Sequence, residues 1–388
     1  MTTDRPSDRR KKGHHKVLVP FSRPTIPLRS ISAFLHSARD ILSSGRLTLG
    51  RYTSRFENSI SRFVGARYAV AMNSCTSVLF SIAMAIGLKP VDEVLVPAVT
   101  FASTANAAIL LGSKPVLVDS DPLTFNMSIE DATRKLKRGK TKAIMVVHLG
   151  GNPVDVRPFL EICRDNNTTL IEDAAHALGS YYGGSHVGKA GRAGAFSFYP
   201  NKIITTGEGG CAITQDQGIA SRLELIRCVA RKGLGPSDVQ TFGGNFRMSE
   251  LQAALGVVQM RTIRSSLSTR GRIAKFYDRE LSGMENLVIS QRITRNSISS
   301  RYAYIVVLGE GIDRDAVRKK LLNQYGVETS ILYVPLHRHP YYRQLGIGGD
   351  LPVADYIGLR SLALPIYGHM TTREASYVIS SLKSVLLE

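Results

Sequence analysis

The segment Ser197–Gly210, SFYPNKIITTGEGG, places one lysine, Lys202, between an apolar, aromatic run and a glycine-rich turn. No other charged residue lies within five positions of this lysine, and an amine in apolar surroundings is a good nucleophile. Twenty-nine residues upstream, Asp173 ends another apolar run in the segment IEDAAH. A lysine that binds an aldehyde and a carboxylate that keeps a pyridine nitrogen protonated are what a pyridoxal 5′-phosphate (PLP) enzyme requires. The pattern therefore predicts PLP chemistry, with Lys202 as the catalytic residue.

Each of these residues also has a purely structural interpretation. A single lysine in a loop is by default a surface residue, and an Asp after a buried strand is often only the N-cap of the next helix. His176 lies three residues after Asp173. It could reach the hydroxyl of a pyridine ring, or it could be an ordinary histidine in the first turn of a helix. These residues alone leave the alternatives open.

Strand-like and helix-like segments alternate from about residue 30, which predicts an α/β domain with a largely parallel sheet. Several apolar runs (VLVP, VLVD and IMVV) are continuous, which is typical of strands covered on both faces. The expected strands are Ala69–Asn73, Glu93–Pro97, Pro115–Asp119, Ala143–His148, Thr169–Asp173, Ala193–Phe198 and Gly210–Thr214. The expected helices include Ser77–Ile86, Val156–Asn166 and a long one at Ser249–Arg264.

The pattern changes after about residue 265, which predicts a large cofactor-binding domain at 17–264 and a smaller α+β domain at 265–388. The segments expected in the smaller domain are a basic helix at Thr269–Leu281, a strand at Ala303–Leu308, a helix at Asp313–Tyr325, a strand at Val327–Leu332 and a last helix that opens at Thr371–Glu374. That last opening, TTRE, is a capping-box pattern. Residues 1–16 are polar and charged, and we expect them to be disordered.

Composition places the chain among soluble globular proteins. Of its 388 residues, 43% are hydrophobic and 21% are charged, which is an ordinary balance. No uninterrupted apolar run reaches the ~18 residues of a membrane span, and the basic N-terminal segment lacks the apolar part of a secretory signal. The four cysteines are widely spaced and form no CxxC pair, which disfavours a zinc site or a disulfide framework. We therefore expect a cytoplasmic protein that binds no metal.

The net charge of +19 has two interpretations. It could serve an anionic partner, or it could reflect basic residues spread over solvated faces, with a cluster at Arg9–Lys12. No RRM, helix-turn-helix or zinc-finger signature accompanies the charge, so a nucleic-acid partner is not favoured. An anionic small substrate would use only a few of these groups.

Six segments together resemble the DegT/DnrJ/EryC1/StrS family of PLP-dependent sugar aminotransferases. In chain order they are NSCTSVLFSIAMAIGL, DEVLVPAVTFASTANA, PVLVDSDPLTFNM, IEDAAHALGSYYGG, FSFYPNKIITTGEGG and GGNFRMSELQAALG. One such segment alone would be weak evidence for the family, but six segments in this order and spacing are specific to it. The resemblance runs from about Pro20 to the C-terminus. It implies the type I fold of PLP-dependent transferases, with a mostly parallel seven-stranded sheet in the large domain. It also implies a homodimer with active sites at the interface.

The resemblance implies cofactor-binding roles for residues that would otherwise pass as structural. Thr76 and Ser77, at the start of a helix, and Ser197, at the end of a strand, would bind the phosphate. Phe101, in VTFAST, would stack on the pyridine ring; from the sequence pattern alone it would be a core residue. Asn245 would reach the phosphate of the partner subunit, although a Gly-Gly-Asn segment is otherwise a turn.

The resemblance also implies contacts with the substrate. Arg247 lies in the same interface segment as Asn245, and Tyr333 and His337 lie where the smaller domain contributes to the sugar pocket. For His337, an ordinary loop position remains an open alternative. Two positions depart from the family: Cys75 stands where Gly or Ala is usual, and Arg51 stands where Pro is usual. The first narrows the space near the phosphate, and the second lies in a loop that commonly borders the active site.

The implied activity is the transfer of an amino group from glutamate or glutamine to a keto-sugar linked to a nucleotide diphosphate. An aminotransferase for a cyclitol or another antibiotic precursor would share every motif. The dehydratase branch of the family carries His in place of the cofactor-binding lysine, so Lys202 disfavours it. A regulatory, nucleic-acid-binding protein would instead show salt-sensitive binding and no chromophore. The sequence leaves open the sugar and the carbon that is aminated.

Overall fold

The computed structural model describes residues 17–231 and 239–388. The expected disorder of residues 1–16 lies outside the described residues. The α-helices are α1 (Leu28–Ser44), α2 (Arg51–Val64), α3 (Cys75–Ala85), α4 (Ala102–Ile109), α5 (Ile129–Lys135), α6 (Arg157–Asn166), α7 (Gln217–Arg227), α8 (Glu250–Met260), α9 (Ile263–Leu281), α10 (Arg314–Tyr325), α11 (Pro340–Gln344), α12 (Pro352–Arg360) and α13 (Thr372–Leu387). Two short 3₁₀ turns are η1 (Leu149–Gly151) and η2 (Leu336–Arg338).

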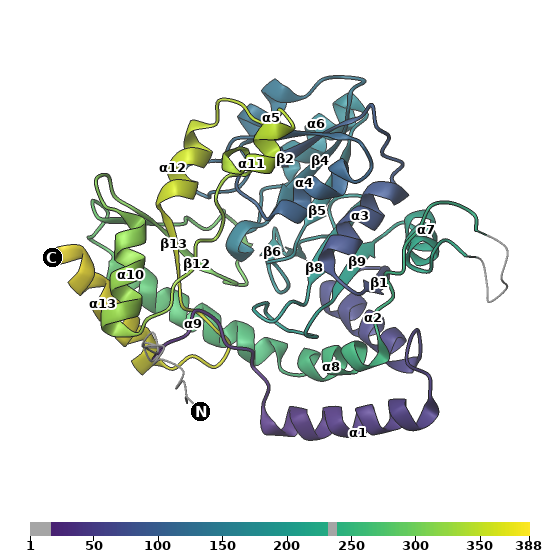
Figure 1. Ribbon diagram of the computed structural model, residues 1–388, viewed down its shortest axis with the longest axis horizontal. Coiled ribbons are helices and arrows are strands. Elements are labelled where there is room, and N and C mark those ends of the chain that lie inside the picture. The colour runs from purple at the N-terminus through teal and green to yellow at the C-terminus, as the bar shows by residue number, and fades with distance from the viewer. Residues whose placement is uncertain (1–16, 232–238) are drawn as a thin grey trace, which may run out of the picture.

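The central sheet has seven strands in the order β1-β9-β8-β5-β4-β2-β3 (Figure 1). Its strands are β1 (Tyr68–Met72), β2 (Glu93–Pro97), β3 (Lys114–Val118), β4 (Thr141–Val147), β5 (Thr169–Asp173), β8 (Ala193–Ser197) and β9 (Gly210–Thr214). β2, β3, β4, β5 and β8 pair in parallel, and β9 is antiparallel to both of its neighbours. The prediction of a mostly parallel seven-stranded α/β sheet is confirmed, with strand ends within two residues of those expected.

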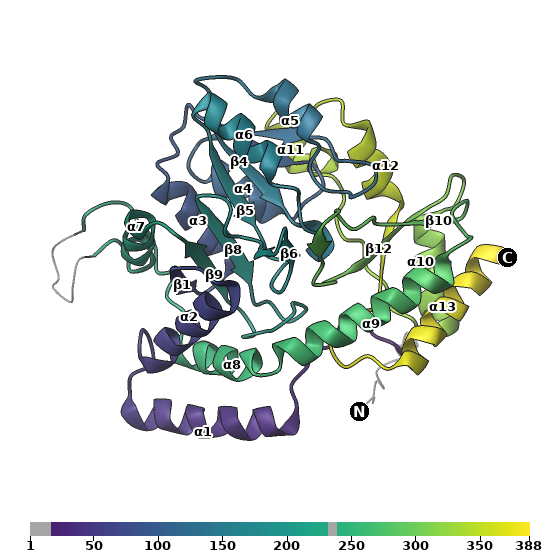
Figure 2. The same ribbon diagram turned by 180° about the vertical axis from the view of Figure 1, so that it is seen from behind.

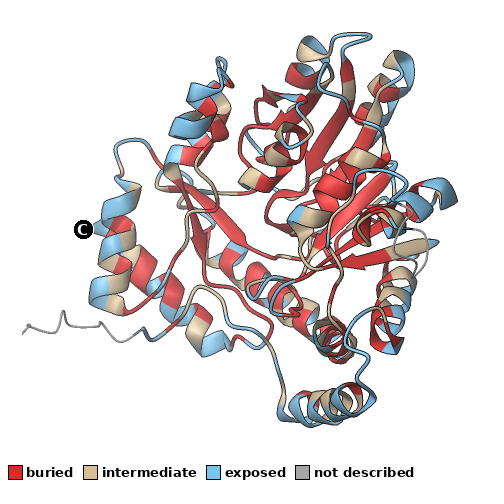
Figure 3. Ribbon diagram, turned by 45° about the vertical axis from the view of Figure 1, so that its right-hand side comes forward, coloured by how far each residue is buried: buried red, intermediate tan, exposed pale blue. Residues whose placement is uncertain are grey.

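The strand direction decides where a site can form. The carboxyl ends of β2, β4, β5 and β8 meet at one edge of the sheet because these strands run parallel. The strands themselves are buried, whereas the helices that cover the sheet expose their outer sides to solvent (Figure 3). Polar side chains that follow the strands at this edge are therefore brought together, as is usual for ligand sites in open α/β sheets.

The C-terminal part builds a second core around an antiparallel sheet. Its strands, in the order β10-β12-β13, are β10 (Val288–Ser290), β12 (Tyr304–Leu308) and β13 (Ser361–Leu364). Helices α9, α10 and α13 contribute buried side chains to this core. The capping box expected at Thr371–Glu374 is present at the start of α13. A third, small sheet joins β6 (Tyr181–Tyr182) to β7 (Ser185–His186) and to β11 (Ser297–Ile298).

Two expectations need correction. The helix expected at Ser249–Arg264 is two helices. At the end of α8 the N–H groups of Arg261 and Thr262 donate to carbonyls three residues back instead of four, and α9 starts at Ile263. Helix α9 spans residue 264, the expected limit of the large domain, and continues from α8, which packs on α1 and α2, to α13 and β10 of the C-terminal part (Figure 2). The strand expected at Val327–Leu332 does not form, because Val327 and Ser330 bridge different partner segments.

The first described residues pack away from the central sheet. Val19 forms a bridge with Val327 and is buried in the C-terminal core, although the sequence placed residues 17–264 in the large domain. None of the described helices has the length and apolar character needed to cross a membrane.

Candidate active site

A cavity of about 430 Å³ opens at the carboxyl edge of the central sheet. Its walls come from the ends of β4, β5 and β8, the starts of α3 and α4, the lysine loop and the C-terminal part. The lining residues are Ser74, Cys75, Thr76, Leu79, Thr100, Phe101, Ser103, Val147, Asp173, Ala175, His176, Ser197, Tyr199, Asn201, Lys202, Glu208, Tyr302 and Tyr333. The cavity thus unites seven of the residues singled out from the sequence: Thr76, Phe101, Asp173, His176, Ser197, Lys202 and Tyr333.

Asp173 is the last residue of β5 and is buried. Its Oδ2 accepts a hydrogen bond of 2.8 Å from the Thr104 hydroxyl, and its Oδ1 accepts one of 3.1 Å from the Ala175 N–H. Burial raises the pKa of Asp173, and these hydrogen bonds together with the nearby Lys202 charge oppose the rise. No helix begins directly after β5, because residues 174–180 lie in a loop with turns, so the N-cap interpretation is wrong. The Asp173 carboxylate can therefore still bind a cationic group.

Lys202 lies in the loop that follows β8, where its backbone N–H donates to the Tyr199 carbonyl. Its Nζ lies 4.4 Å from the centroid of the Tyr302 ring. A cation over the face of an aromatic ring is an attractive arrangement. The lysine is therefore part of the cavity wall and not a surface residue.

His176 is also buried and lies in a turn, so it is not in the first turn of a helix. Its Nε2 is 2.9 Å from the Tyr333 hydroxyl, and its ring stacks on that of Tyr302, with centroids 4.2 Å apart. Burial lowers the pKa of His176 well below its ordinary value, and the Lys202 charge adds to this effect. The imidazole is consequently neutral at physiological pH.

The start of α3 forms another wall of the cavity. Ser74 is the N-cap, and the first N–H groups of a helix, which have no partner within it, can bind an anion. The Thr76 hydroxyl lies 2.7 Å from that of Ser103, in the first turn of α4. A Cβ on Gly210 would come within 2.6 Å of the Ser74 and Cys75 backbone. Glycine at this position therefore lets β9 approach the helix start.

Ser77 lies in the same helical turn but outside the cavity wall. Its hydroxyl donates to the Asn73 Oδ1 at 2.7 Å, so the structure does not bring it to the site expected from the sequence. Phe101, in contrast, is 56% exposed, although it lies in the cavity wall. Its ring centroid is 5.9 Å from that of Tyr333. The core interpretation of Phe101 is therefore wrong.

Three further predicted residues do not line the cavity of this single chain. Asn245 is exposed, its backbone carbonyl accepts a hydrogen bond from the Asn73 side-chain amide, and it forms an isolated bridge with Cys228. Arg247 forms a backbone bridge with Met72. His337 borders a separate surface depression, and its Nε2 pairs with the Asp355 carboxylate at 2.8 Å.

Of the two departures from the family pattern, only one reaches the cavity. Cys75 lines it, and burial raises the pKa of its thiol well above the ordinary value, so the thiol stays protonated. Arg51 instead starts α2 and pairs with Asp40 at 2.6 Å. It does not line this cavity.

Some residues of the site were missed by sequence reasoning. Thr100, Ser103 and Thr104 lie in the same VTFAST segment as Phe101, and their spacing at a helix start was a usable signal. Tyr302 comes from the C-terminal part, two residues before β12, and only tertiary packing brings it against His176 and Lys202.

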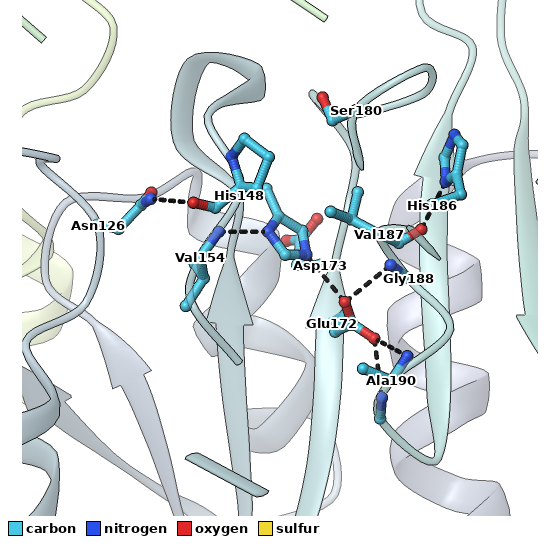
Figure 4. Close-up of polar contacts among 12 residues, drawn as sticks. Asn126, His148, Val154, Glu172, Asp173, Ser180, His186, Val187, Gly188 and Ala190 are labelled. Carbon is cyan, nitrogen blue, oxygen red and sulfur yellow. Dashed lines mark hydrogen bonds and ion pairs between the residues drawn. The ribbon is translucent and has the colours of Figure 1, made fainter. Parts of the chain in front are cut away.

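A second buried carboxylate, Glu172, lies next to Asp173 on β5, and its polar contacts are drawn in Figure 4. It accepts hydrogen bonds from the backbone N–H groups of Gly188, Ala190 and Gly191 at 2.7–2.8 Å. Its Oε2 also lies 3.1 Å from the His148 Nε2. Burial alone would raise the pKa of Glu172, but the His148 and backbone hydrogen bonds lower it below its ordinary value. Glu172 therefore holds the loop before β8 in place as an ionised group.

Comparison with known proteins decides the family. The model of the DegT/DnrJ/EryC1/StrS aminotransferase family matches residues 30–383. The chain belongs to this family. It is 37% identical, over 88% of its length and 91% of the relative, to a protein named GDP-perosamine synthase from Caulobacter vibrioides.

Solved structures agree with this assignment. The aminotransferase TlmJ from Streptoalloteichus hindustanus superposes with a TM-score of 0.88 at 30% identity, over 95% of this chain and 99% of the other. Spr1654 from Streptococcus pneumoniae, which is named as a sugar aminotransferase, superposes with a TM-score of 0.88 at 28% identity, over 95% of this chain and 98% of the other. It has been solved in PLP and PMP forms. This chain is accordingly a PLP-dependent aminotransferase.

The cavity fits that cofactor. An amine, a buried carboxylate and an exposed aromatic ring lie around it, and a helix start with several hydroxyl groups forms one wall. The Asn201 Oδ1 is buried without a hydrogen-bond partner among the described residues, so one acceptor still awaits a donor. Within residues 17–231 and 239–388, no group of three or more His, Cys, Asp or Glu side chains could hold a metal ion.

Proposed function

We propose that this aminotransferase moves an amino group from glutamate or glutamine to a nucleotide-linked keto-sugar in amino-sugar biosynthesis. The observation that carries the proposal is that Lys202 and Asp173 line one cavity in a member of this aminotransferase family. The name of the 37% identical relative, GDP-perosamine synthase, supports a nucleotide-linked sugar as the amino acceptor.

Each of these cavity residues would contact a different part of the cofactor. Asp173 would hold the pyridine nitrogen, and Phe101 would stack on the ring. The start of α3 with Thr76 and Ser197 would bind the phosphate, and His176 would lie near the ring hydroxyl. When bound, PLP supplies a carbon that takes up the amino group and a ring that withdraws electrons.

Lys202 has two tasks in this proposal. Its Nζ would hold the cofactor through the aldehyde carbon, which orients the cofactor before substrate arrives. Once free, the same Nζ would accept the proton from the α-carbon of the amino donor and later deliver a proton to the former carbonyl carbon of the sugar. The Tyr302 face, 4.4 Å from Nζ, would keep the free amine beside the reacting carbon.

The substrate side of the proposal extends beyond one subunit. We expect a cytoplasmic homodimer in which Asn245 and Arg247 reach the partner's site, which agrees with the exposed position of Asn245. Tyr333 and His337 would contact the sugar, Tyr333 from the cavity wall and His337 from the depression that it borders. The diphosphate would be bound by cationic side chains.

A substrate panel tests the function. The purified protein with PLP is given nucleotide-linked keto-sugars, with glutamate or glutamine as donor, and amino-sugar product is measured by mass spectrometry. One member should be converted, and Lys202→Ala should convert none. If no member yields product while a keto-cyclitol does, the sugar assignment is wrong.

Subunit mixing tests the shared site. If Asn245 serves the partner's site, inactive Lys202→Ala and weakened Asn245→Ala subunits should regain activity when unfolded together and refolded as mixed dimers. A monomeric protein with full activity would contradict the homodimer.

A further inference from the structure

Two buried threonine hydroxyls form a hydrogen-bonded chain that ends on Asp173. Thr104, in the first turns of α4, lies with its Oγ1 2.8 Å from the Asp173 Oδ2. Thr100, which precedes the helix, lies with its Oγ1 2.8 Å from the Thr104 Oγ1. Both threonines are at most 2% exposed, so water does not compete for these contacts.

The direction of the chain follows from counting protons. An ionised carboxylate has no proton to give, so the Thr104 hydroxyl must donate to Asp173. Thr104 has only one hydroxyl proton and has used it, so the Thr100 hydroxyl must donate to the Thr104 oxygen. The reverse orientation would leave the buried Oδ2 of Asp173 without a donor, which is costly for a charged group. The chain therefore runs from Thr100 through Thr104 to Asp173, and each bond polarises the next.

The electrostatic balance at Asp173 makes this donor important. Burial raises the pKa of the carboxyl group, and the Thr104 hydrogen bond is the largest of the opposing effects, ahead of the Ala175 N–H and the Lys202 charge. The neighbouring hydroxyl, that of Ser103, is turned toward Thr76 instead. Of these two side chains in α4, Thr104 is the one that contacts Asp173.

We infer that Thr104, oriented by Thr100, is a positioning residue that keeps Asp173 ionised and fixed for its cofactor partner. The inference rests on the proposed role of Asp173 as the partner of the pyridine nitrogen. Thr104 itself touches neither the cofactor nor the substrate in this account. It acts only through the carboxylate.

The matched variants are Thr104→Val, which keeps the shape but removes the hydroxyl, and Thr104→Ser, which keeps the hydroxyl. The dissociation constant of PLP is measured by equilibrium dialysis from pH 5 to pH 9. Because a hydrogen bond to a charged group is lost, Thr104→Val should weaken PLP binding roughly 10- to 100-fold near neutral pH. The pH below which binding declines should also rise, since Asp173 is then protonated more easily. Thr104→Ser should bind much like the unmodified protein.

The controls separate this inference from the proposed function. Asp173→Asn should bind PLP poorly; if it binds normally, the role of Asp173 itself fails. If Asp173→Asn binds poorly but Thr104→Val binds normally, the role of Thr104 fails alone. Weaker binding by Thr104→Val without a shift in the pH profile also overturns the inference, because it indicates general damage. If Thr104→Val does not fold, Thr100→Val should shift the profile in the same direction by less, and an unchanged profile would overturn the inference.

Discussion

Replacement of Glu172 by Gln should destabilise the protein although the two side chains have nearly the same shape. Glu172 offers two oxygens to four donors: Oε1 accepts from Ala190 and Gly191, and Oε2 accepts from Gly188 and His148. The His148 Nδ1 accepts from the Val154 N–H, so the ring proton lies on Nε2 and donates to Glu172. Every donor is therefore satisfied by one ionised side chain.

A glutamine can keep only two of these four bonds. Its oxygen can replace one carboxylate oxygen, but its NH₂ group then faces two donors. A buried donor left without an acceptor costs ~1–3 kcal/mol, so two should cost about 2–6 kcal/mol. This is a large part of the roughly 5–15 kcal/mol by which native proteins are stable. Because β5 also carries Asp173 and the affected loop leads into β8, the affinity for PLP should fall as well.

Urea unfolding of the cofactor-free protein at pH 7.5 measures the change, and hydrogen exchange locates it. The Gly188, Ala190 and Gly191 amides should exchange faster in Glu172→Gln. Glu310→Gln is the matched control, because Glu310 is exposed and such surface changes stay within about 0.5 kcal/mol. The reasoning is refuted if Glu172→Gln loses less than about 1 kcal/mol and these amides remain protected.

Two other predictions concern stability at low pH and the packing of β9 against the start of α3. Burial lowers the pKa of His186 to about 4 and that of His176 well below its ordinary value, so the folded protein keeps both neutral while the unfolded chain protonates them near pH 6.5. Stability should be full above that pH and fall toward pH 4, by up to about 1.4 kcal/mol per pH unit for each histidine. Urea unfolding at pH 7 and pH 5 checks this, and equal stability at both would contradict it. Gly210→Ala should push the start of α3 away from β9, because its Cβ would meet the Ser74 backbone at 2.6 Å. Its PLP affinity should fall about tenfold or more, and an unchanged affinity would show that the contact relaxes without consequence.

The parts of the fold that the sequence predicted well are those with a local signal. Several of the seven strands are continuous apolar runs, and Lys202 and Asp173 are polar residues at or after the ends of apolar runs. A strand end in a parallel sheet fixes which edge a side chain reaches, so two distant residues could be assigned to one site.

The remainder depends on contacts that no short segment encodes. Tyr302 reaches Lys202 only because the C-terminal part packs over the sheet edge. The position of Thr104 at a helix start is visible in the sequence, but the contact of its hydroxyl with Asp173, 69 positions away in the chain, is not. The segment Val327–Leu332 has the residues of a strand but meets two different partners and forms no ladder. Asn245, which we propose to reach the site of the partner subunit, lies outside the cavity of its own chain.

The most direct test of the account is where PLP becomes attached. The protein is incubated with PLP, reduced with borohydride, digested and mapped by mass spectrometry. We predict a phosphopyridoxyl group on Lys202 alone, and a visible absorption band before reduction that the Lys202→Ala variant lacks. Labelling of a different lysine, or an unchanged visible band in Lys202→Ala, would contradict the assignment of Lys202 as the catalytic residue.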